Sequence, residues 1–297
     1  MTAGLAPARS FLGLVKIEHS VFALPFAYLS ALTALAVGPK HVHWLDLALV
    51  TIAMVGARTF AMAANRIIDR HIDARNPRTS GRELVTGVVS VRTAWLGAIV
   101  ALVVFLGAAA LLNPLCLALS PLAVLPLIVY PYGKRFTNWP HAILALAQMV
   151  GPVGAWLAVT GTVRGSFPAW VLGAAVGLWI GGFDLIYATQ DAGVDREIGV
   201  KSVPARYGVR FALRASSVVH AVTFALFVWY GVLVGLGAWW WVGLVLTAVA
   251  FVYEHAIVRP DDLSRVNRAF FTANGFVGIA LFAFALIDLV ARLGLRP

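Results

Sequence analysis

Three oxygen-bearing side chains recur at helical spacing in the first quarter of the chain. Asn65, Asp69 and Asp73 are separated by intervals of four residues. Successive members of such a series drift by only about 40° around an α-helix, so all three lie on one helical face. A helix with this sequence presents a row of amide and carboxylate oxygens, which we call the first acidic row.

A second acidic row lies farther along the chain. Asp184, Asp191 and Asp195 are separated by seven and then four residues, which places them within a helical stripe about 40° wide. Carboxylates on one face near a low-dielectric boundary repel one another unless cations neutralise them. Their oxygens suit Mg²⁺, which binds one or two carboxylates and completes its shell with water and phosphate oxygens. Together the rows predict two or more Mg²⁺ ions around a diphosphate.

An alternative interpretation is that the acids are solvated loop charges. Basic residues that could pair with them stand nearby in the sequence, namely Arg66, Arg70, Arg75 and Arg196. Acids with basic neighbours are commonly neutralised in this way. This interpretation does not account for two separate rows, so the metal site is favoured.

The composition places both rows in a membrane protein. Of the 297 residues, 61% are hydrophobic and only 12% are charged, whereas soluble domains carry about 25% charged residues. A disordered chain is excluded by the apolar fraction, and a disulfide-stapled domain by the single cysteine, Cys116.

Nine apolar stretches are long enough to cross a hydrocarbon core about 30 Å thick. All should be helices, because unpaired backbone groups in lipid are too costly. The sequence therefore predicts an all-α integral membrane protein, embedded in the lipid bilayer as a single domain over residues 1–297. The predicted spans are 17–37, 46–68, 94–112, 114–132, 142–163, 169–189, 214–236, 238–257 and 270–291.

The basic residues predict the orientation. Of the 23 Lys and Arg residues, 18 lie in the N-terminal tail and in the connections that follow the even-numbered spans. Positive residues mark the cytoplasmic face, so we expect a cell (inner or plasma) membrane protein with a cytoplasmic N-terminus and an external C-terminus. This explains the net charge of +10 without a nucleic-acid partner, and no obligate protein partner is inferred.

Several residues near span ends are expected at the membrane interface, where amphipathic side chains prefer the headgroup region. They are Trp44, Trp139, Trp170, residues 239–241 and Asp288.

The two acidic rows resemble the motifs of the UbiA superfamily of intramembrane prenyltransferases. Asn65, Asp69 and Asp73 match its NxxxDxxxD motif, and Asp191 with Asp195 match its DxxxD motif. The flanking stretches 76–79 and 187–202 are also similar, and the resemblance covers nearly the whole chain. It implies a nine-helix bundle whose central cavity opens near the cytoplasmic face, where Mg²⁺ assists ionisation of a polyprenyl diphosphate and the prenyl group passes to an acceptor.

Several basic and polar residues are candidates for binding the diphosphate. Arg78, Lys134 and Lys201 are predicted at the cytoplasmic face together with Asn65. Tyr130 precedes Lys134 by four residues, as a tyrosine precedes a lysine in related enzymes. Lys134 could equally be one of the positive charges that set the orientation.

Arg58 lies inside the second predicted span, seven residues before Asn65. A charge within the membrane needs a partner, and a guanidinium binds a carboxylate through two hydrogen bonds. We therefore expect Arg58 to recognise the carboxylate of an aromatic acceptor, as a basic residue does in related enzymes. The alternative is a structural ion pair, for which the candidate partners are Glu18, Asp184 and Glu254.

Asp184, Tyr187 and Asp191 are the candidate catalytic residues. Asp184 is predicted deeper in the membrane than Asp191, where it could act on the acceptor as a base or orient its hydroxyl, or complete a metal shell. Tyr187 could orient a phosphate or face a carbocation, or be an interfacial tyrosine. The sequence contains no HxxxH or His/Cys cluster typical of a transition-metal site, so His255 is expected to have a hydrogen-bonded structural role.

The acceptor is narrowed by two further stretches, residues 18–27 and 202–208, which look like the branch that prenylates 4-hydroxybenzoate in quinone (ubiquinone or menaquinone) biosynthesis. An aromatic carboxylic acid is the first expectation. The branch includes members of the futalosine route to menaquinone, whose acceptor is a carboxylated naphthol; Arg206 and the pair Arg82-Glu83 favour these. A transporter is the alternative from another class, but its charged site would lie near the bilayer midplane rather than at span ends.

Overall fold

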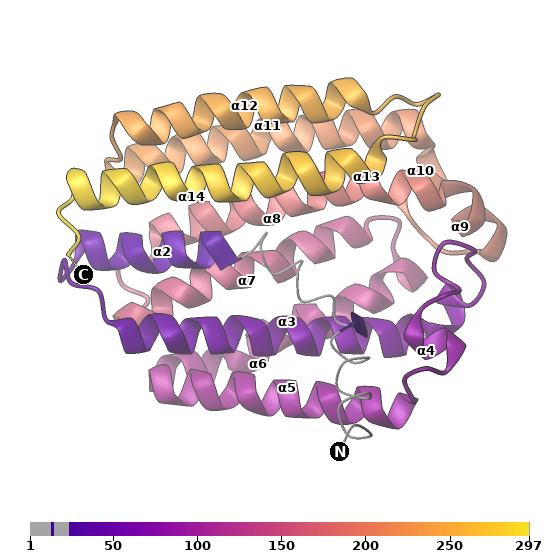
Figure 1. Ribbon diagram of the computed structural model, residues 1–297, viewed down its shortest axis with the longest axis horizontal. Coiled ribbons are helices and arrows are strands. Elements are labelled where there is room, and N and C mark those ends of the chain that lie inside the picture. Colours follow the sequence, from indigo (N-terminus) through magenta and orange to yellow (C-terminus); the bar gives the residue numbers. More distant parts are fainter. Residues whose placement is uncertain (1–12, 15–23, 297) are drawn as a thin grey trace, which may run out of the picture.

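The structure is a computed structural model that describes residues 13–14 and 24–296, and nearly all of this part is helical (Figure 1). The elements are α2 Leu24–Val37, α3 Trp44–Asp73, α4 Glu83–Thr86, α5 Val91–Leu112, α6 Pro114–Phe136, α7 Pro140–Thr160, α8 Phe167–Ala188, η2 Thr189–Asp191, α9 Ala192–Ile198, α10 Val203–Tyr207, α11 Val209–Val234, α12 Ala238–Ile257, α13 Val266–Arg268, η3 Ala269–Ala273 and α14 Asn274–Ala291.

The prediction of an all-α membrane bundle is confirmed. Within the described residues, eight helical segments are long and apolar enough to cross a membrane, counting α8 to α9 and α13 to α14 as one segment each. They correspond to the last eight predicted spans. The first predicted span, 17–37, is represented by α2, which has 14 residues; its beginning lies outside the described residues.

Polar side chains cap the long helices where the chain reverses direction. The Asn113 side chain accepts a hydrogen bond from the Cys116 amide at 2.9 Å and so caps the start of α6. The same side chain donates to the carbonyl oxygens of Leu157 and Ala158 near the end of α7, at 3.0 and 2.9 Å. One asparagine thus satisfies groups at the ends of two helices.

Small residues let the central helices approach closely. A Cβ atom at Gly177 in α8 would clash with the carbonyl oxygen of Ala145 in α7. At Gly182, also in α8, a Cβ atom would lie 2.5 Å from the ring of His220 in α11. Helices in lipid associate largely through such close packing, and α8 accordingly packs against both α7 and α11.

Two residues expected at the interface are buried instead. Trp240 has an exposed fraction of 0% and packs against Phe227 and Tyr230, because the first turn of α12 lies over α11. Asp288 is 3% exposed and accepts hydrogen bonds from the backbone amides of Gly237 and Trp240 at 3.0 and 2.7 Å. It therefore caps the start of α12 from α14, which the sequence pattern of either helix alone does not reveal.

The short helices gather at one end of the bundle. Figure 1 shows α4, α9 and α10 together at this end, while the C-terminus and the connection between α2 and α3 lie at the other. Both acidic rows end here, at the C-terminal ends of α3 and of the segment from α8 to α9. The fold thus brings two rows that are more than a hundred residues apart to the same place.

Candidate active site

The two acidic rows face one polar cavity at this end of the bundle. Its wall contains Asn65 and Asp73 from α3, and Asp184, Asp191 and Asp195 from the segment that runs from α8 through η2 to α9. Because η2 keeps a right-handed helical backbone between α8 and α9, the second row stays on one side of a nearly continuous helix. We call this space the polar cavity.

Asp69, the central member of the first row, lies behind this wall. Its side chain is 1% exposed. Lys134 Nζ lies 2.6 Å from one carboxylate oxygen, and Arg135 Nη1 donates to the other at 3.1 Å. Both cations stand at the end of α6, which packs against α3. Asp69 therefore holds Lys134 at the cavity wall.

Asp191 is bound by the loop that follows α3. Arg78 Nε donates to Asp191 Oδ1 at 2.8 Å, its Nη2 forms an ion pair with Oδ2, and Asn76 Nδ2 donates to Oδ1 at 2.9 Å. Burial lowers the pKa of the Arg78 guanidinium, but the hydrogen bond and charge of Asp191 outweigh it, so the pKa lies above its ordinary value. Arg78 is a permanent cation at the cavity wall.

Tyr187 shares this arginine. Arg78 Nη1 donates to the Tyr187 hydroxyl at 3.1 Å, and the ring of Tyr187 packs against Phe270 of η3 with centroids 4.5 Å apart. The tyrosine therefore lines the polar cavity with a fixed ring and a hydroxyl tied to a cation.

The remaining acids of the two rows also have defined partners. Arg82 Nη1 donates to Asp73 Oδ1 at 2.6 Å, and the Ser202 hydroxyl donates to Asp195 Oδ2 at 3.0 Å. The cations that pair with the rows are thus Arg78, Arg82, Lys134 and Arg135, rather than the four sequence neighbours considered above. Each of them comes from the loop after α3 or the end of α6.

Asp184 has a partner that sequence analysis did not identify. His141, in the first turn of α7, has its Nδ1 atom 2.6 Å from Asp184 Oδ2. When Nδ1 carries the hydrogen and donates it to the carboxylate, the other ring nitrogen presents a lone pair. That atom, Nε2, is buried and has no hydrogen-bond partner among the described residues, and His141 lines the polar cavity. The pair has the arrangement of an oriented base.

The other predicted substrate-binding residues lie on the same wall. Tyr130, Lys134 and Lys201 all line the polar cavity. The backbone amide of Lys201 donates to the carbonyl oxygen of Lys134 at 2.9 Å, which ties the loop after α9 to the end of α6. All three thus come together from elements distant in sequence.

Two further cavities lie next to one another beside the polar cavity. Arg58 lines the next one, which shares Asn65 and Tyr130 with the polar cavity. A third cavity shares Met54 and Gly151 with the Arg58 cavity. Apart from Ser120 and Cys116, it is lined by Ala, Val, Leu, Met, Phe and Gly residues from α3, α5, α6 and α7, and we call it the apolar cavity.

Two of the candidate structural partners of Arg58 have other contacts. Asp184 binds His141, as described above. Glu254 accepts a hydrogen bond from Asn274 in α14 at 2.9 Å. The third candidate, Glu18, lies outside the described residues.

Sequence analysis did not assign roles to Arg82, Arg135 or His141. Arg135 and Arg82 are basic residues of loops predicted to be cytoplasmic, and this position could have suggested them as partners for the acidic rows. His141 carries no local signal, because its pairing with Asp184 depends on the packing of α7 against α8.

Comparisons with known proteins identify relatives of this chain. A model of the UbiA prenyltransferase family matches residues 23–276. The chain is 35% identical over 248 residues to the 4-hydroxybenzoate octaprenyltransferase of Alkalilimnicola ehrlichii, covering 82% of this chain and 83% of that protein. It is 34% identical over 288 residues to a protein of the same name from Aromatoleum aromaticum, with 95% and 94% covered.

Solved structures give the same result. The apo structure of a UbiA homologue from Aeropyrum pernix K1 superposes with a TM-score of 0.83 at 37% identity, covering 92% of this chain and 98% of that chain. The structure of a UbiA homologue from Archaeoglobus fulgidus bound to DMAPP and Mg²⁺ has the same fold, with a TM-score of 0.71 at 21% identity and coverages of 94% and 99%. The chain belongs to the UbiA prenyltransferase family, as its two acidic rows around one cavity in a membrane bundle indicate.

Proposed function

We propose that this protein transfers a polyprenyl group from a polyprenyl diphosphate to an aromatic carboxylic acid of the 4-hydroxybenzoate type, with Mg²⁺ as its cofactor. The observation that carries the proposal is the order of the three cavities. A cavity walled by acids and cations shares Asn65 and Tyr130 with a cavity that contains one arginine, and that cavity shares Met54 and Gly151 with an apolar one. A diphosphate, a carboxylated ring and a polyprenyl chain need these three environments.

The relatives support the same assignment. The proteins named 4-hydroxybenzoate octaprenyltransferase match this chain over most of their length. The Archaeoglobus fulgidus structure contains both DMAPP, a prenyl diphosphate, and Mg²⁺. Substrate class and cofactor are therefore consistent with a member of this family.

The residues of the polar cavity fit Mg²⁺. The proposed ligands, Asn65, Asp69, Asp73, Asp191 and Asp195, supply only amide and carboxylate oxygens, which are the hard ligands this ion prefers. Bound Mg²⁺ neutralises charge on a diphosphate and so makes it a better leaving group. For Asp69 and Asp191 to bind the ion, the cations that hold them must turn toward the phosphate oxygens, which lie within reach of the same wall.

We assign the diphosphate to the cations of this wall. Arg78, Lys134 and Lys201 line the polar cavity, and charge-assisted hydrogen bonds from such groups stabilise an anion as negative charge develops on it. Asn65 and Tyr130 line both the polar cavity and the next cavity. The carbon–oxygen bond that breaks would therefore lie near these two residues, with the prenyl chain in the apolar cavity.

Arg58 is assigned to the acceptor. Arg58 lines the cavity between the polar and apolar cavities, where its guanidinium would offer a carboxylate a planar pair of donors. The acceptor ring would then lie against Asn65 and Tyr130. The alternative acceptor, a carboxylated naphthol, has the same carboxylate and would use the same arginine.

The chemistry requires no covalent bond to the protein. Departure of the diphosphate leaves an allylic carbocation, and a ring carbon of the acceptor supplies the electron pair for the new carbon–carbon bond. The ring then loses one proton. We assign Tyr187 to face the cation with its ring, and the pair Asp184–His141 to accept the proton at His141 Nε2, with Asp184 holding the ring orientation.

The membrane arrangement is part of the proposal. The polar cavity opens at the end that carries the basic loops, so we assign this end to the cytoplasmic face of the cell membrane. Water-soluble diphosphate would leave on that side, while the prenylated product remains in the bilayer.

The test is a product assay on membranes that contain the protein. A polyprenyl diphosphate and Mg²⁺ are supplied with either 4-hydroxybenzoate or a carboxylated naphthol, and prenylated product and released diphosphate are both measured. Prenylation of 4-hydroxybenzoate that stops on chelation supports the proposal. Prenylation of the naphthol alone would transfer the assignment to the alternative acceptor, and Mg²⁺-dependent diphosphate release without either product would contradict the role of Arg58.

A further inference from the structure

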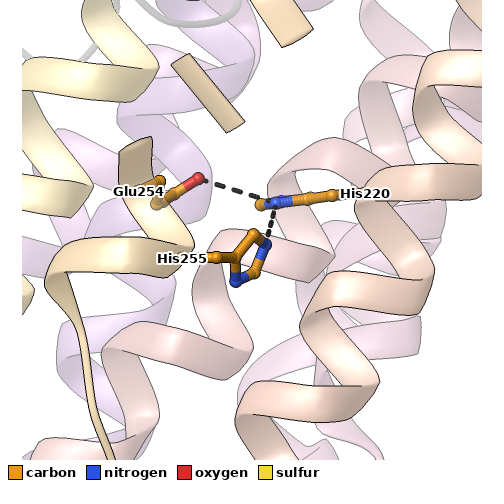
Figure 2. Close-up of side chains that lie close together, drawn as sticks. All are labelled: His220, Glu254 and His255. Atoms are coloured by element: carbon orange, nitrogen blue, oxygen red, sulfur yellow. Dashed lines mark hydrogen bonds and ion pairs between the residues drawn. The ribbon is translucent and has the colours of Figure 1, made fainter. Parts of the chain in front are cut away.

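A second group of ligand-type side chains lies between α11 and α12. Figure 2 shows His220 of α11 pointing toward Glu254 and His255 of α12. Two imidazole nitrogens and one carboxylate oxygen of these residues lie within 4.8 Å of one another. None of the three residues is among the described residues that line the polar cavity, so the group is separate from the site proposed above. We call it the His–Glu–His cluster.

The hydrogen bonds around His220 fix which ring nitrogen carries the hydrogen. His220 Nε2 lies 3.2 Å from the backbone carbonyl oxygen of Trp179, which can only accept. A neutral His220 therefore keeps its hydrogen on Nε2 and directs a lone pair from Nδ1 toward the cluster. The ring of His220 has little freedom to turn, because it stacks on Phe251 with centroids 4.6 Å apart and packs closely against Gly182 of α8.

His255 is oriented in the same sense. Its Nδ1 atom lies 3.2 Å from the Ser217 hydroxyl, and that hydroxyl donates its own hydrogen to the carbonyl oxygen of Leu213 at 3.1 Å. Ser217 can then accept from His255 Nδ1, which leaves a lone pair on His255 Nε2. This atom lies 3.0 Å from His220 Nδ1. With these tautomers the two lone pairs face each other, and they repel each other unless a cation lies between them.

Glu254 adds a third donor atom. The residue is 0% exposed, and its Oε1 atom accepts a hydrogen bond from Asn274 at 2.9 Å. Its Oε2 atom accepts no hydrogen bond from the described residues and lies 3.6 Å from His220 Nδ1. A buried carboxylate oxygen without a hydrogen bond is costly, and the three ligand atoms of the cluster lie within 4.8 Å of one another.

The spacing suits a tetrahedral metal ion. Ligands about 2.0–2.1 Å from Zn²⁺ lie about 3.3 Å from one another in tetrahedral geometry. The measured separations of 3.0 and 3.6 Å are close to this value. Ring nitrogens that are not ligands are bound to a carbonyl and a hydroxyl, and the second carboxylate oxygen to an amide, which are the outer partners that orient metal ligands.

We propose that His220 Nδ1, His255 Nε2 and Glu254 Oε2 form a binding site for a divalent transition-metal ion of the zinc type. Two imidazoles and one carboxylate favour such an ion over Mg²⁺, which prefers oxygen ligands. His255 and Ser217 also line a surface pocket, so this side of the cluster borders the protein surface. The ion would tie α11 to α12 and, through Asn274, to α14.

The experiment uses the full-length protein in detergent, with excess Mg²⁺ to occupy oxygen ligands and Co²⁺ as the probe. Tetrahedral Co²⁺ bound to nitrogen absorbs strongly in the visible range, whereas Co²⁺ surrounded by six oxygens absorbs weakly. We expect one equivalent of strongly absorbing Co²⁺ that one equivalent of Zn²⁺ displaces. His220→Ala and Glu254→Gln should remove the signal, while Ser217→Ala and Asn274→Ala, which leave all three ligands in place, should weaken binding about 10- to 100-fold.

Matched controls separate this cluster from other sites. His43→Gln removes an exposed histidine elsewhere in the chain, and Asp191→Asn removes a carboxylate of the polar cavity. Both should keep the full Co²⁺ signal. A wild-type protein without the signal would overturn the proposal. A signal that survives in both Glu254→Gln and His220→Ala would overturn it as well.

Discussion

The polar cavity and the His–Glu–His cluster gather metal-ligating side chains in opposite ways. In the polar cavity the proposed ligands are oxygens, and the cations Arg78, Arg82, Lys134 and Arg135 pair with the carboxylates. In the cluster, two imidazole nitrogens and one carboxylate oxygen point at each other between two helices. The first arrangement suits an ion that arrives with an anionic substrate, and the second suits an ion that stays bound.

The difference follows from how each carboxylate is stabilised. Asp69 and Asp191 are held by the long side chains of Lys134 and Arg78, which in our proposal turn to a phosphate when a metal ion takes their place. Glu254 is held by a neutral amide on a third helix. The proposed catalytic site thus contains ion pairs that can be exchanged, whereas the ligands of the proposed structural site are held by hydrogen bonds to neutral groups.

Removal of an oxygen ligand from the polar cavity should have the largest effect. We expect Asp191→Asn or Asp69→Asn to lower kcat by at least about 10²- to 10³-fold, since stabilisation of the leaving diphosphate is lost. The measurement is diphosphate release from membranes with matched amounts of folded protein. Near-normal turnover in either variant would remove metal-assisted ionisation from the account and erase the contrast with the His–Glu–His cluster.

His141 tests whether a neutral base operates beside the oxygen ligands. His141→Asn places an amide donor near the position of Nδ1, so it preserves the hydrogen bond to Asp184 but removes Nε2. We expect kcat to fall about 10²-fold, the lower end of the range for loss of a positioned general base, with little change in the KM for the diphosphate. If Asp184→Asn reduces kcat and His141→Asn does not, Asp184 itself accepts the proton.

Arg58 should affect the acceptor more than the donor. Arg58→Ala removes a charge-assisted contact worth about 1.5–3 kcal/mol, so the acceptor KM should rise roughly 10- to 100-fold. The KM for the polyprenyl diphosphate should change much less. Arg58→Lys keeps the charge without the paired donors, and an uncharged phenol serves as the control acceptor, because its KM should not respond to either substitution.

Ser202 should give the smallest effect. Its hydroxyl donates to Asp195 Oδ2, and loss of one such hydrogen bond costs about 1 kcal/mol. Ser202→Ala should therefore raise the Mg²⁺ concentration needed for half-maximal rate about fivefold, with kcat retained at saturating Mg²⁺. An unchanged Mg²⁺ requirement would place Asp195 outside the metal site and reduce the second row to Asp184 and Asp191.

Most of the fold was predictable because hydropathy and backbone satisfaction in lipid act locally. The last eight predicted spans correspond to long apolar helical segments, and at Asn113 the predicted boundary between two spans is the observed one, since α5 ends at Leu112 and α6 begins at Pro114. The predicted interfacial positions of Trp240 and Asp288 were wrong. Each residue is buried by a neighbouring helix, which the sequence around the residue does not specify.

The sequence by itself determined the chemical character of the proposed catalytic site. Residues four and seven apart share a helical face whatever the helix packs against, so the acidic rows and their preference for Mg²⁺ could be inferred from spacing alone. The pairing of Asp184 with His141, of Asp69 with Arg135, and the whole His–Glu–His cluster were decided by tertiary structure. These contacts join residues that are 43, 66 and 35 positions apart, and only the packing of one helix against another brings such residues within hydrogen-bond distance.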